Sequence, residues 1–402
     1  MRRLALTIAG AALLLPFVPA LGSTAPPAAG CSWSSNSDPD AVNAAYPDTN
    51  ATYWFTPYAA APGTKLVVRG IYPKARYFSF HVYHPGGVPV GSLYDAQIAP
   101  DRGSANPFAG RRARVGRSYT LTVVFTPKPA HPAANTIYAS STGIGTTPNP
   151  GGQLMLRVYV PNDPHSPDGG VALPTVTTET TSGTVISAGG ACSGALPAAG
   201  GAVNNTLVGN SFPAQSPTAD PTSTISWSRA HGNPYAGFYG NEQNAYLTAS
   251  ISRRFGDFVV IHAKAPLFPN TRAGVPPYVR NDVRYWSICQ NSNSTRVNSC
   301  AADFEAHVRR GWFTYVISDP SQRPRNADAA HGAVWLPWGA ADATGLLIYR
   351  NMLVAPTFRH AVQDVKQGDD PKRVMGAYYP SAVYCDKATF ERDGWQGCFY
   401  RQ

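Results

Sequence analysis

The chain has 402 residues and a formal net charge of +10, and its basic residues are scattered. A prior of about 150 residues per domain predicts two or three domains. The longest basic cluster, Arg111-Arg112-Ala113-Arg114, is short, so the charge pattern argues against an extended nucleic-acid surface and we predict no nucleic-acid partner.

Residues 1–22 are typical of a secretory signal, because Arg2 and Arg3 precede an apolar stretch. We therefore predict a secreted or extracytoplasmic protein of the cell envelope. No later stretch has about 18 uninterrupted apolar residues, which predicts no transmembrane helix in the mature chain. Residues 28–31, Ala-Ala-Gly-Cys, are similar to a lipoprotein cleavage box. A lipid anchor at Cys31 is thus an alternative to a structural cysteine, which we favour.

Six cysteines in an exported chain predict three disulfides. Proximity favours pairing Cys289 with Cys300 and Cys385 with Cys398, which leaves Cys31 with Cys192. Six cysteines allow 15 pairings, so other connectivities remain open.

Short segments rich in β-branched and aromatic residues, bounded by Gly and Pro, predict strands. They are residues 53–55, 65–69, 76–83, 119–125 and 154–160. Strands at this spacing, without strong helices between them, favour an antiparallel sandwich or barrel.

The two halves of the chain repeat the same residue types at the same intervals, which indicates an internal duplication. The repeated intervals are Tyr53 to Gly63 with Tyr246 to Gly256, Arg76 to Asp95 with Arg284 to Asp303, and Gly152 to Arg157 with Gly345 to Arg350. We predict a mainly β protein made of two duplicated β-sandwich-like domains with a few short helices.

The predicted order is the signal (1–22), β domain one (31–161), a Gly/Pro/Ser/Thr-rich linker or excursion (162–226), and β domain two with a helical C-terminal extension (227–402). Two helices are predicted from apolar spacing. The first covers residues 357–368, with Thr357 as cap and Phe358, Ala361, Val362 and Val365 as the apolar stripe. The second is shorter and covers residues 301–310.

Residues 77–83 alternate between two faces of a strand, which predicts one polar and aromatic face. Tyr77, Ser79, His81 and Tyr83 on this face could bind and stack on a sugar-like ligand. His81 could also act as an acid or base. The alternatives are a half-exposed strand face or an interface with the second copy.

Both halves repeat two arginines and one aspartate. The residues are Arg76, Asp95 and Arg157 in the first half and Arg284, Asp303 and Arg350 in the second. A carboxylate between two guanidinium groups forms charge-assisted hydrogen bonds. We predict a structural ion network within each domain, with an anion site in each domain as the alternative.

Signatures of common hydrolases, zinc proteases and nucleotide-binding proteins are not found in the sequence. His262, His331 and His360, with Asp282 or Asp303, offer a metal-ligand set, but their spacing does not place them together. We predict no metal and no cofactor.

The run Leu93-Tyr94-Asp95, followed by Ile98, Pro100, Asp101, Gly103, Ser104 and Asn106-Pro107-Phe108, resembles exported bacterial proteins that are carried as domains of unknown function. The resemblance implies export and a β-rich fold, and it implies no activity.

Two functions are compatible with the sequence. The first is an exported protein that binds a carbohydrate-like ligand or surface polymer through the polar face of residues 77–83. The second is an extracellular hydrolase or lyase that uses His81 or a carboxylate such as Asp95.

Overall fold

The computed structural model describes residues 30–37, 43, 45–84, 87–110, 116–140, 150–192, 196, 221–229, 239–292, 296–339 and 342–400. Four predicted features lie wholly or largely outside these residues. They are the signal, most of the segment similar to a lipoprotein cleavage box, the basic cluster 111–114, and the part of the predicted linker after residue 192. No helix in the described part of the chain is long and apolar enough to cross a membrane.

The first domain (residues 30–192) consists of two facing five-stranded sheets. One sheet has the order β1 (Ser35–Ser37), β2 (Ala51–Ala59), β8 (Gly151–Pro161), β4 (Ala75–Tyr83), β5 (Pro89–Tyr94). The other has the order β10 (Val185–Ala188), β9 (Thr175–Thr180), β3 (Thr64–Ile71), β6 (Ser118–Val124), β7 (Thr136–Tyr138). Alternation along β4 directs Phe78, Phe80 and Val82 into the core between the sheets, where they join Leu121 and Val123 of β6.

The second domain (residues 221–400) repeats this plan. Its first sheet has the order β11 (Ser228–Arg229), β12 (Asn244–Ser252), β18 (Thr344–Val354), β14 (Val283–Asn291), β15 (Val297–Ala302). Its second sheet has the order β17 (Ala333–Pro337), β16 (Trp312–Ser318), β13 (Phe258–Lys264), β19 (Ser381–Tyr384). The strand pairings of the two domains correspond, including the parallel pair β6 and β7 and its counterpart β16 and β17.

The strand register shows that the two domains are duplicated in detail. Ser79 of β4 lies opposite Arg157 of β8, and Ser287 of β14 lies opposite Arg350 of β18. The prediction of a mainly β fold with two duplicated β-sandwich-like domains is therefore confirmed.

The predicted linker begins too early. Strands β9 and β10 follow Pro161 and extend the second sheet of the first domain, where β9 pairs with β3. The Thr-rich segment at 175–180 has the β-branched side chains that favour a strand. It was assigned to the linker because the sequence on both sides of it is rich in turn-forming residues. The first domain continues to the disulfide at Cys192.

Both predicted helices are wrong. Residues 357–368 form a loop with one short turn, in which the Val362 N–H donates to the Asn351 side chain of β18 (3.0 Å). The side chains of the predicted apolar stripe are buried in the core of the second domain, although they belong to a loop and not to a helix. In the other segment, residues 301 and 302 belong to β15, and the left-handed backbone at His307 and Arg310 (φ 48° and 51°) prevents a helix.

Two α-helices are found in the described residues, and both lie near the C-terminus: α1 (Pro371–Met375) and α2 (Lys387–Phe399). The remaining helical turns are η1 (Asp95–Gln97), η3 (Thr271–Ala273), η4 (Asp303–Glu305), η5 (Pro320–Gln322), η6 (Val362–Asp364) and η7 (Gly376–Tyr378). Asp386 caps α2 by accepting the Thr389 N–H (2.8 Å).

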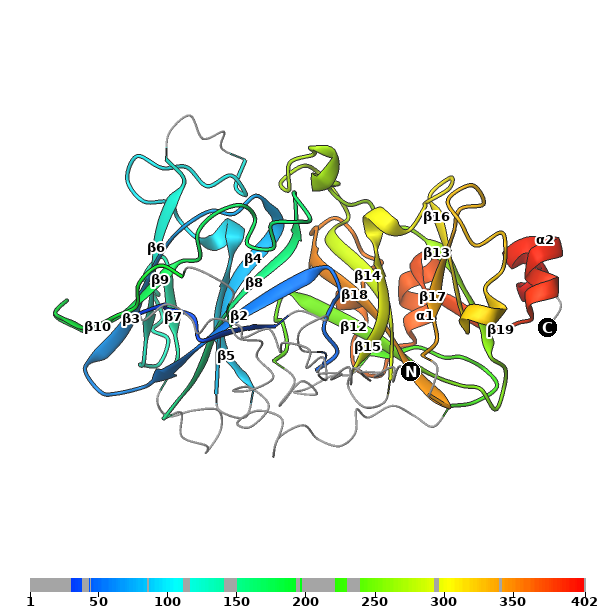
Figure 1. The fold of residues 1–402 in the computed structure, drawn as a ribbon, viewed down its shortest axis with the longest axis horizontal. Helices are drawn as coiled ribbons and strands as arrows, with labels where there is room; N and C mark the ends of the chain where they lie inside the picture. Colours follow the sequence, from blue (N-terminus) through cyan, green and yellow to red (C-terminus); the bar gives the residue numbers. More distant parts are fainter. Residues whose placement is uncertain are drawn as a thin grey trace, which may run out of the picture.

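The two sandwiches lie side by side, and α2 lies at the far end of the second domain (Figure 1). The outer faces of their five-stranded sheets form a third buried cluster with residues from both domains. For example, the rings of Tyr159 and Tyr285 meet edge to face with centroids 5.4 Å apart. An apolar and aromatic interface therefore joins the domains.

Candidate functional site

The polar face of β4, predicted to bind a ligand, is buried between the domains. Tyr77, Ser79, His81 and Tyr83 each have 0% exposure. Tyr77 Oη donates to Gln243 Oε1 (2.9 Å), and Tyr83 Oη donates to the Gly240 carbonyl (2.8 Å). The face thus forms the interface with the second copy, which was the alternative interpretation of this pattern.

The repeated arginines and aspartates are paired across the interface. Arg76 of the first domain donates to Asp303 of the second. Reciprocally, Arg284 Nη1 donates to Asp95 Oδ1 (3.2 Å). The prediction of an ion network within each domain is therefore wrong, since both pairs join one domain to the other. The guanidinium of Arg76 also lies over rings of the second domain, with the Phe268 centroid at 5.2 Å.

Each aspartate also accepts a backbone N–H of its own domain. Phe78 N donates to Asp95 Oδ2 and Trp286 N donates to Asp303 Oδ2, both at 3.1 Å. Burial raises the pKa of both carboxyl groups, and the arginine partners lower it in part, so the pKa of Asp303 lies at about 6.

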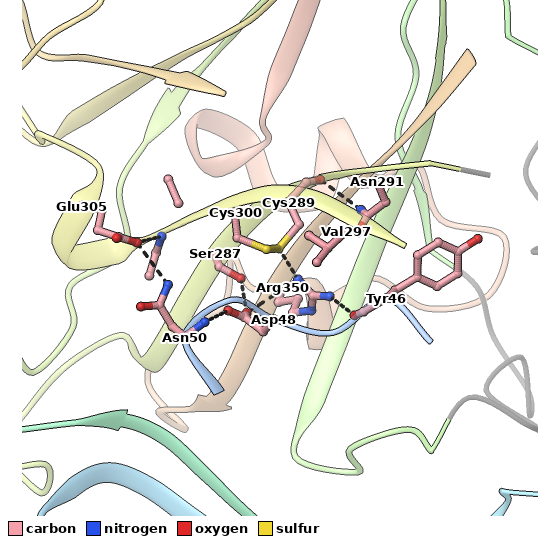
Figure 2. Close-up of a disulfide and its surroundings, with 12 residues drawn as sticks. Tyr46, Asp48, Asn50, Ser287, Cys289, Asn291, Val297, Cys300, Glu305 and Arg350 are labelled. Atoms are coloured by element: carbon pink, nitrogen blue, oxygen red, sulfur yellow. Dashed lines mark hydrogen bonds and ion pairs between the residues drawn. A yellow bond between two sulfur atoms is a disulfide. The ribbon is translucent and has the colours of Figure 1, made fainter. Parts of the chain in front are cut away.

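Arg350 does not belong to these ion pairs but lies beside another buried aspartate, Asp48, which was not predicted as a site residue (Figure 2). Its Nη1 is 3.6 Å from Asp48 Oδ2 and donates to Cys289 Sγ (2.6 Å). Asp48 also accepts hydrogen bonds from Tyr285 Oη and Ser287 Oγ, both at 2.8 Å. Asp48 precedes Tyr53 by five residues, as Asn241 precedes Tyr246, so the repeat marks its position although the residue type differs between the copies.

Neither predicted catalytic residue is accessible. His81 is fully buried, its Nδ1 lies 3.2 Å from Ser79 Oγ, and burial keeps its pKa well below the usual value. Asp95 is fully buried and paired with Arg284. A substrate cannot reach either group while the domains are in contact.

The three predicted disulfides are present: Cys31 with Cys192, Cys289 with Cys300, and Cys385 with Cys398. Such bonds persist in oxidising compartments and are compatible with an extracytoplasmic location. The sulfur of Cys31 is bonded to Cys192, so it is not available for a thioether-linked lipid, and the structure does not support the lipid-anchor alternative.

The histidines of the metal alternative have separate partners. His331 Nδ1 lies 2.7 Å from Asp328 Oδ1, and His360 stacks on Tyr378. Among the described residues, one group has metal-ligand spacing, Asp48 with Cys289 and Cys300. Its cysteines form a disulfide and offer no thiolate ligand.

A cleft of about 560 Å³ lies between α2 and the second sheet of the second domain. This volume lies within the range of small-molecule sites. The lining residues are Thr314, Arg325, Asn326, His331, Ala333, Phe390, Glu391, Arg392, Gly394, Trp395 and Gln396. The cleft has no counterpart in the repeat, because α2 follows the last strand that the domains share.

The two walls of the cleft are joined by polar contacts. The Arg325 N–H donates to Glu391 Oε1 (2.9 Å), and Arg325 Nε lies 3.7 Å from Glu391 Oε2. Asn326 Nδ2 donates to the Phe390 carbonyl (3.1 Å), whereas its Oδ1 is buried without a hydrogen-bond partner. The cleft therefore offers a carboxylate and a guanidinium, and a buried amide oxygen without a partner lies in its wall.

Trp395 is held in the cleft by an aromatic stack. The ring of His262 on β13 lies between Trp395 (centroids 3.7 Å apart) and Trp312 (5.0 Å). His262 Nδ1 lies 3.0 Å from Thr314 Oγ1, and burial lowers the pKa of His262 to about 4. A neutral histidine thus fixes the indole that lines the cleft.

The chain is thus a duplicated β-sandwich protein with a cleft beside helix α2 in its second copy. No family model matches the chain, and no curated protein matches it. An uncharacterized protein from Burkholderia cenocepacia is similar in structure, with a TM-score of 0.50 and 15% identity over 81% of this chain and 79% of that chain. The VPA0106 protein from Vibrio parahaemolyticus matches with a TM-score of 0.41 and 12% identity over 85% and 90%. The first likeness shows the fold alone, and the second is too weak to carry an argument.

Proposed function

We propose that this protein is an exported, cell-envelope or extracellular binding protein that holds a carbohydrate-like ligand or surface polymer in the α2 cleft. The observation that carries the proposal is the indole of Trp395, fixed on His262 beside hydrogen-bonding groups of the cleft. A flat ring next to convergent polar groups matches the apolar face and hydroxyl edges of a sugar ring.

The location and charge of the protein support the same function. The signal-like N-terminal residues and three disulfides favour a place outside the cytoplasm. The net charge is +10 for the whole chain and becomes +8 when Arg2 and Arg3 are removed with the predicted signal, and this surplus would attract anionic surface polymers over long range.

A hydrolase or lyase is the second candidate, and one observation favours it. His331 lines the cleft and is oriented by Asp328 through a 2.7 Å contact, which is an arrangement suited to general-base catalysis. In this version His331 takes the role that the sequence analysis gave to His81 or Asp95.

Binding to a glycan array, followed by turnover assays on each bound glycan, tests both candidates. Trp395→Ala and Arg325→Gln should each abolish or strongly weaken binding, whereas Tyr278→Ala, which removes an exposed aromatic ring outside the cleft lining, should leave it unchanged. Arg325 is 81% exposed, so its variant keeps the fold. Binding that survives both cleft variants would refute the α2 cleft as the site, and turnover lost in His331→Ala would favour the enzyme.

A further inference from the structure

The domain interface has two equivalent ends, one at Arg350 and one at Arg157, which are related by the internal repeat. Arg350 Nη2 donates to the Tyr46 carbonyl (2.7 Å), and Arg157 Nη2 donates to the Tyr239 carbonyl. Tyr46 and Tyr239 both have a left-handed backbone, with φ of 54° and 52°. The same unusual loop geometry therefore presents a carbonyl to the equivalent arginine at each end.

Asp48 and Asn241 occupy the equivalent position in these loops. Asp48 Oδ1 accepts the Tyr285 hydroxyl (2.8 Å), and Asn241 Oδ1 accepts the Tyr77 hydroxyl (3.3 Å). Each Oδ1 also accepts the backbone N–H two residues later, at 3.0 Å in both loops. The first oxygen of the side chain has the same role at both ends.

The second atom of the side chain differs between the ends. In Asp48 it is an oxygen that faces Arg350 at 3.6 Å. In Asn241 it is the Nδ2 amide, which is a donor like the guanidinium of Arg157. No ion pair joins Arg157 to a carboxylate among the described residues, so the carboxylate present at one end is missing at the other.

Three nitrogen atoms at the Arg157 end are buried without hydrogen-bond partners. They are Arg157 Nη1, Asn241 Nδ2 and His81 Nε2, in residues that are at most 4% exposed. When Ser79 Oγ donates to His81 Nδ1 (3.2 Å), the ring hydrogen is on Nε2, and all three atoms are donors. Buried donors without acceptors and a buried guanidinium without a carboxylate partner both lower the stability of the folded state. A negatively charged acceptor at this end would therefore stabilise the protein.

We propose that a small monocarboxylate, such as acetate or formate, binds between the domains at Arg157. Its oxygens would accept hydrogen bonds from Arg157 Nη1 and Asn241 Nδ2, and the ligand would supply the negative charge that the Asp48 carboxylate supplies at the Arg350 end. The site is independent of the α2 cleft, because it belongs to the opposite side of the second domain's sandwich and uses first-domain residues.

The melting temperature of the mature chain measured against acetate concentration tests this proposal. At pH 7, with ionic strength held by the sodium salt of a bulky sulfonate, 200 mM acetate should raise the Tm of the parent by roughly 2–4 °C. Asn241→Asp supplies the missing carboxylate within the chain, so its Tm should no longer respond to acetate. Asp48→Asn creates the same amide at the other end, so its response should be at least as large as that of the parent.

Two results would overturn the proposal: a parent whose Tm does not respond to acetate, or an Asn241→Asp variant that responds as strongly as the parent. If Asn241→Asp does not fold, Arg157→Met replaces it in the comparison. That variant should lose the acetate response, and retention of the response would equally overturn the site.

Discussion

Arg76 of the first domain and Asp303 of the second form an ion pair in which both side chains are fully buried. Its symmetric counterpart, between Arg284 and Asp95, leaves the Arg284 side chain 11% exposed. Each pair takes one residue from each domain. The repeated charges therefore lie in the contact between the domains, beside its cluster of aromatic and apolar side chains.

Asp303→Asn is expected to destabilise the protein more than Asp95→Asn. Removing the carboxylate at 303 leaves Arg76 buried without its charge partner, a change that typically costs about 3–5 kcal/mol in the free energy of unfolding. Arg284 reaches solvent in part, so the loss at 95 should be smaller. Urea unfolding of the two variants measures the difference, and equal losses would contradict it.

A matched surface variant calibrates this comparison. Asp369 pairs with Arg373 at 3.4 Å in an exposed setting, so Asp369→Asn should change the free energy of unfolding by only about 0–1 kcal/mol.

The stability of the protein relative to Asp303→Asn should increase as the pH falls from 7 to 4. Burial raises the pKa of Asp303 to about 6, above the ordinary aspartate value of 3.8 expected for the unfolded chain. Between these values the folded state keeps a proton that the unfolded state has lost, so this group stabilises the fold fully below 3.8, and its contribution is lost as the pH rises through 6. Melting temperatures of both proteins across this range check the sign, and a difference that shrinks toward pH 4 would contradict it.

Trp395→Ala should raise the pKa of His262. Burial, with Trp395 and Trp312 covering the two faces of the ring, lowers this pKa to about 4, and removing one indole admits water to the imidazolium. In the parent, the unfolded state binds a proton between pH 6.5 and 4 that the folded state does not, so the contribution of His262 to stability is present above 6.5 and lost toward 4. NMR titration of His262 measures the shift.

Trp312→Ala serves as the comparison, since its ring lies farther from His262 (5.0 Å against 3.7 Å). We expect a smaller rise in the pKa there, and a pKa that stays at about 4 in both variants would show that other groups keep His262 neutral.

Removal of the disulfide between Cys385 and Cys398 should open the cleft while the core strands stay folded. The bond ties the end of α2 to Cys385, the residue after β19, and α2 has a non-helical residue, Gly394 (φ 66°), in its last turns. A Cys385→Ser, Cys398→Ser variant should be cut by trypsin after Lys387 and Arg392, at sites that the parent protects. The equivalent variant of Cys31 and Cys192 should leave these two sites protected, and cutting at them in that variant would contradict a local role for the α2 disulfide.

The repeat and its strand faces could be predicted from sequence because alternation is a local property. Phe78, Phe80 and Val82 are buried together in the first core as their spacing requires. Proximity along the chain likewise predicted the disulfide between Cys289 and Cys300, whose residues lie opposite each other in β14 and β15.

The partners across the interface could not be predicted from the same information. The interval from Arg76 to Asp95 is identical in the two halves, so it is equally compatible with pairing inside a domain and with exchange between domains. The α2 cleft was missed for a different reason. Helix α2 combines charged residues with Gly394 and Gly397 and lacks a regular apolar stripe, and it is held by its cap at Asp386, the disulfide and packing on β13.

An interface whose contacts are exchanged reciprocally between equivalent positions is what two identical chains would form about a two-fold axis. In such a dimer every substitution occurs twice, so losing one aspartate would remove both ion pairs at once. Fusion of the halves into one chain lifts that restriction. The first half has His81 opposite Ser92, whereas the second half has a disulfide at the corresponding positions, Cys289 and Cys300. Helix α2 belongs to the second half. The covalent link between the halves therefore allowed each to specialise without dismantling the contact that joins them.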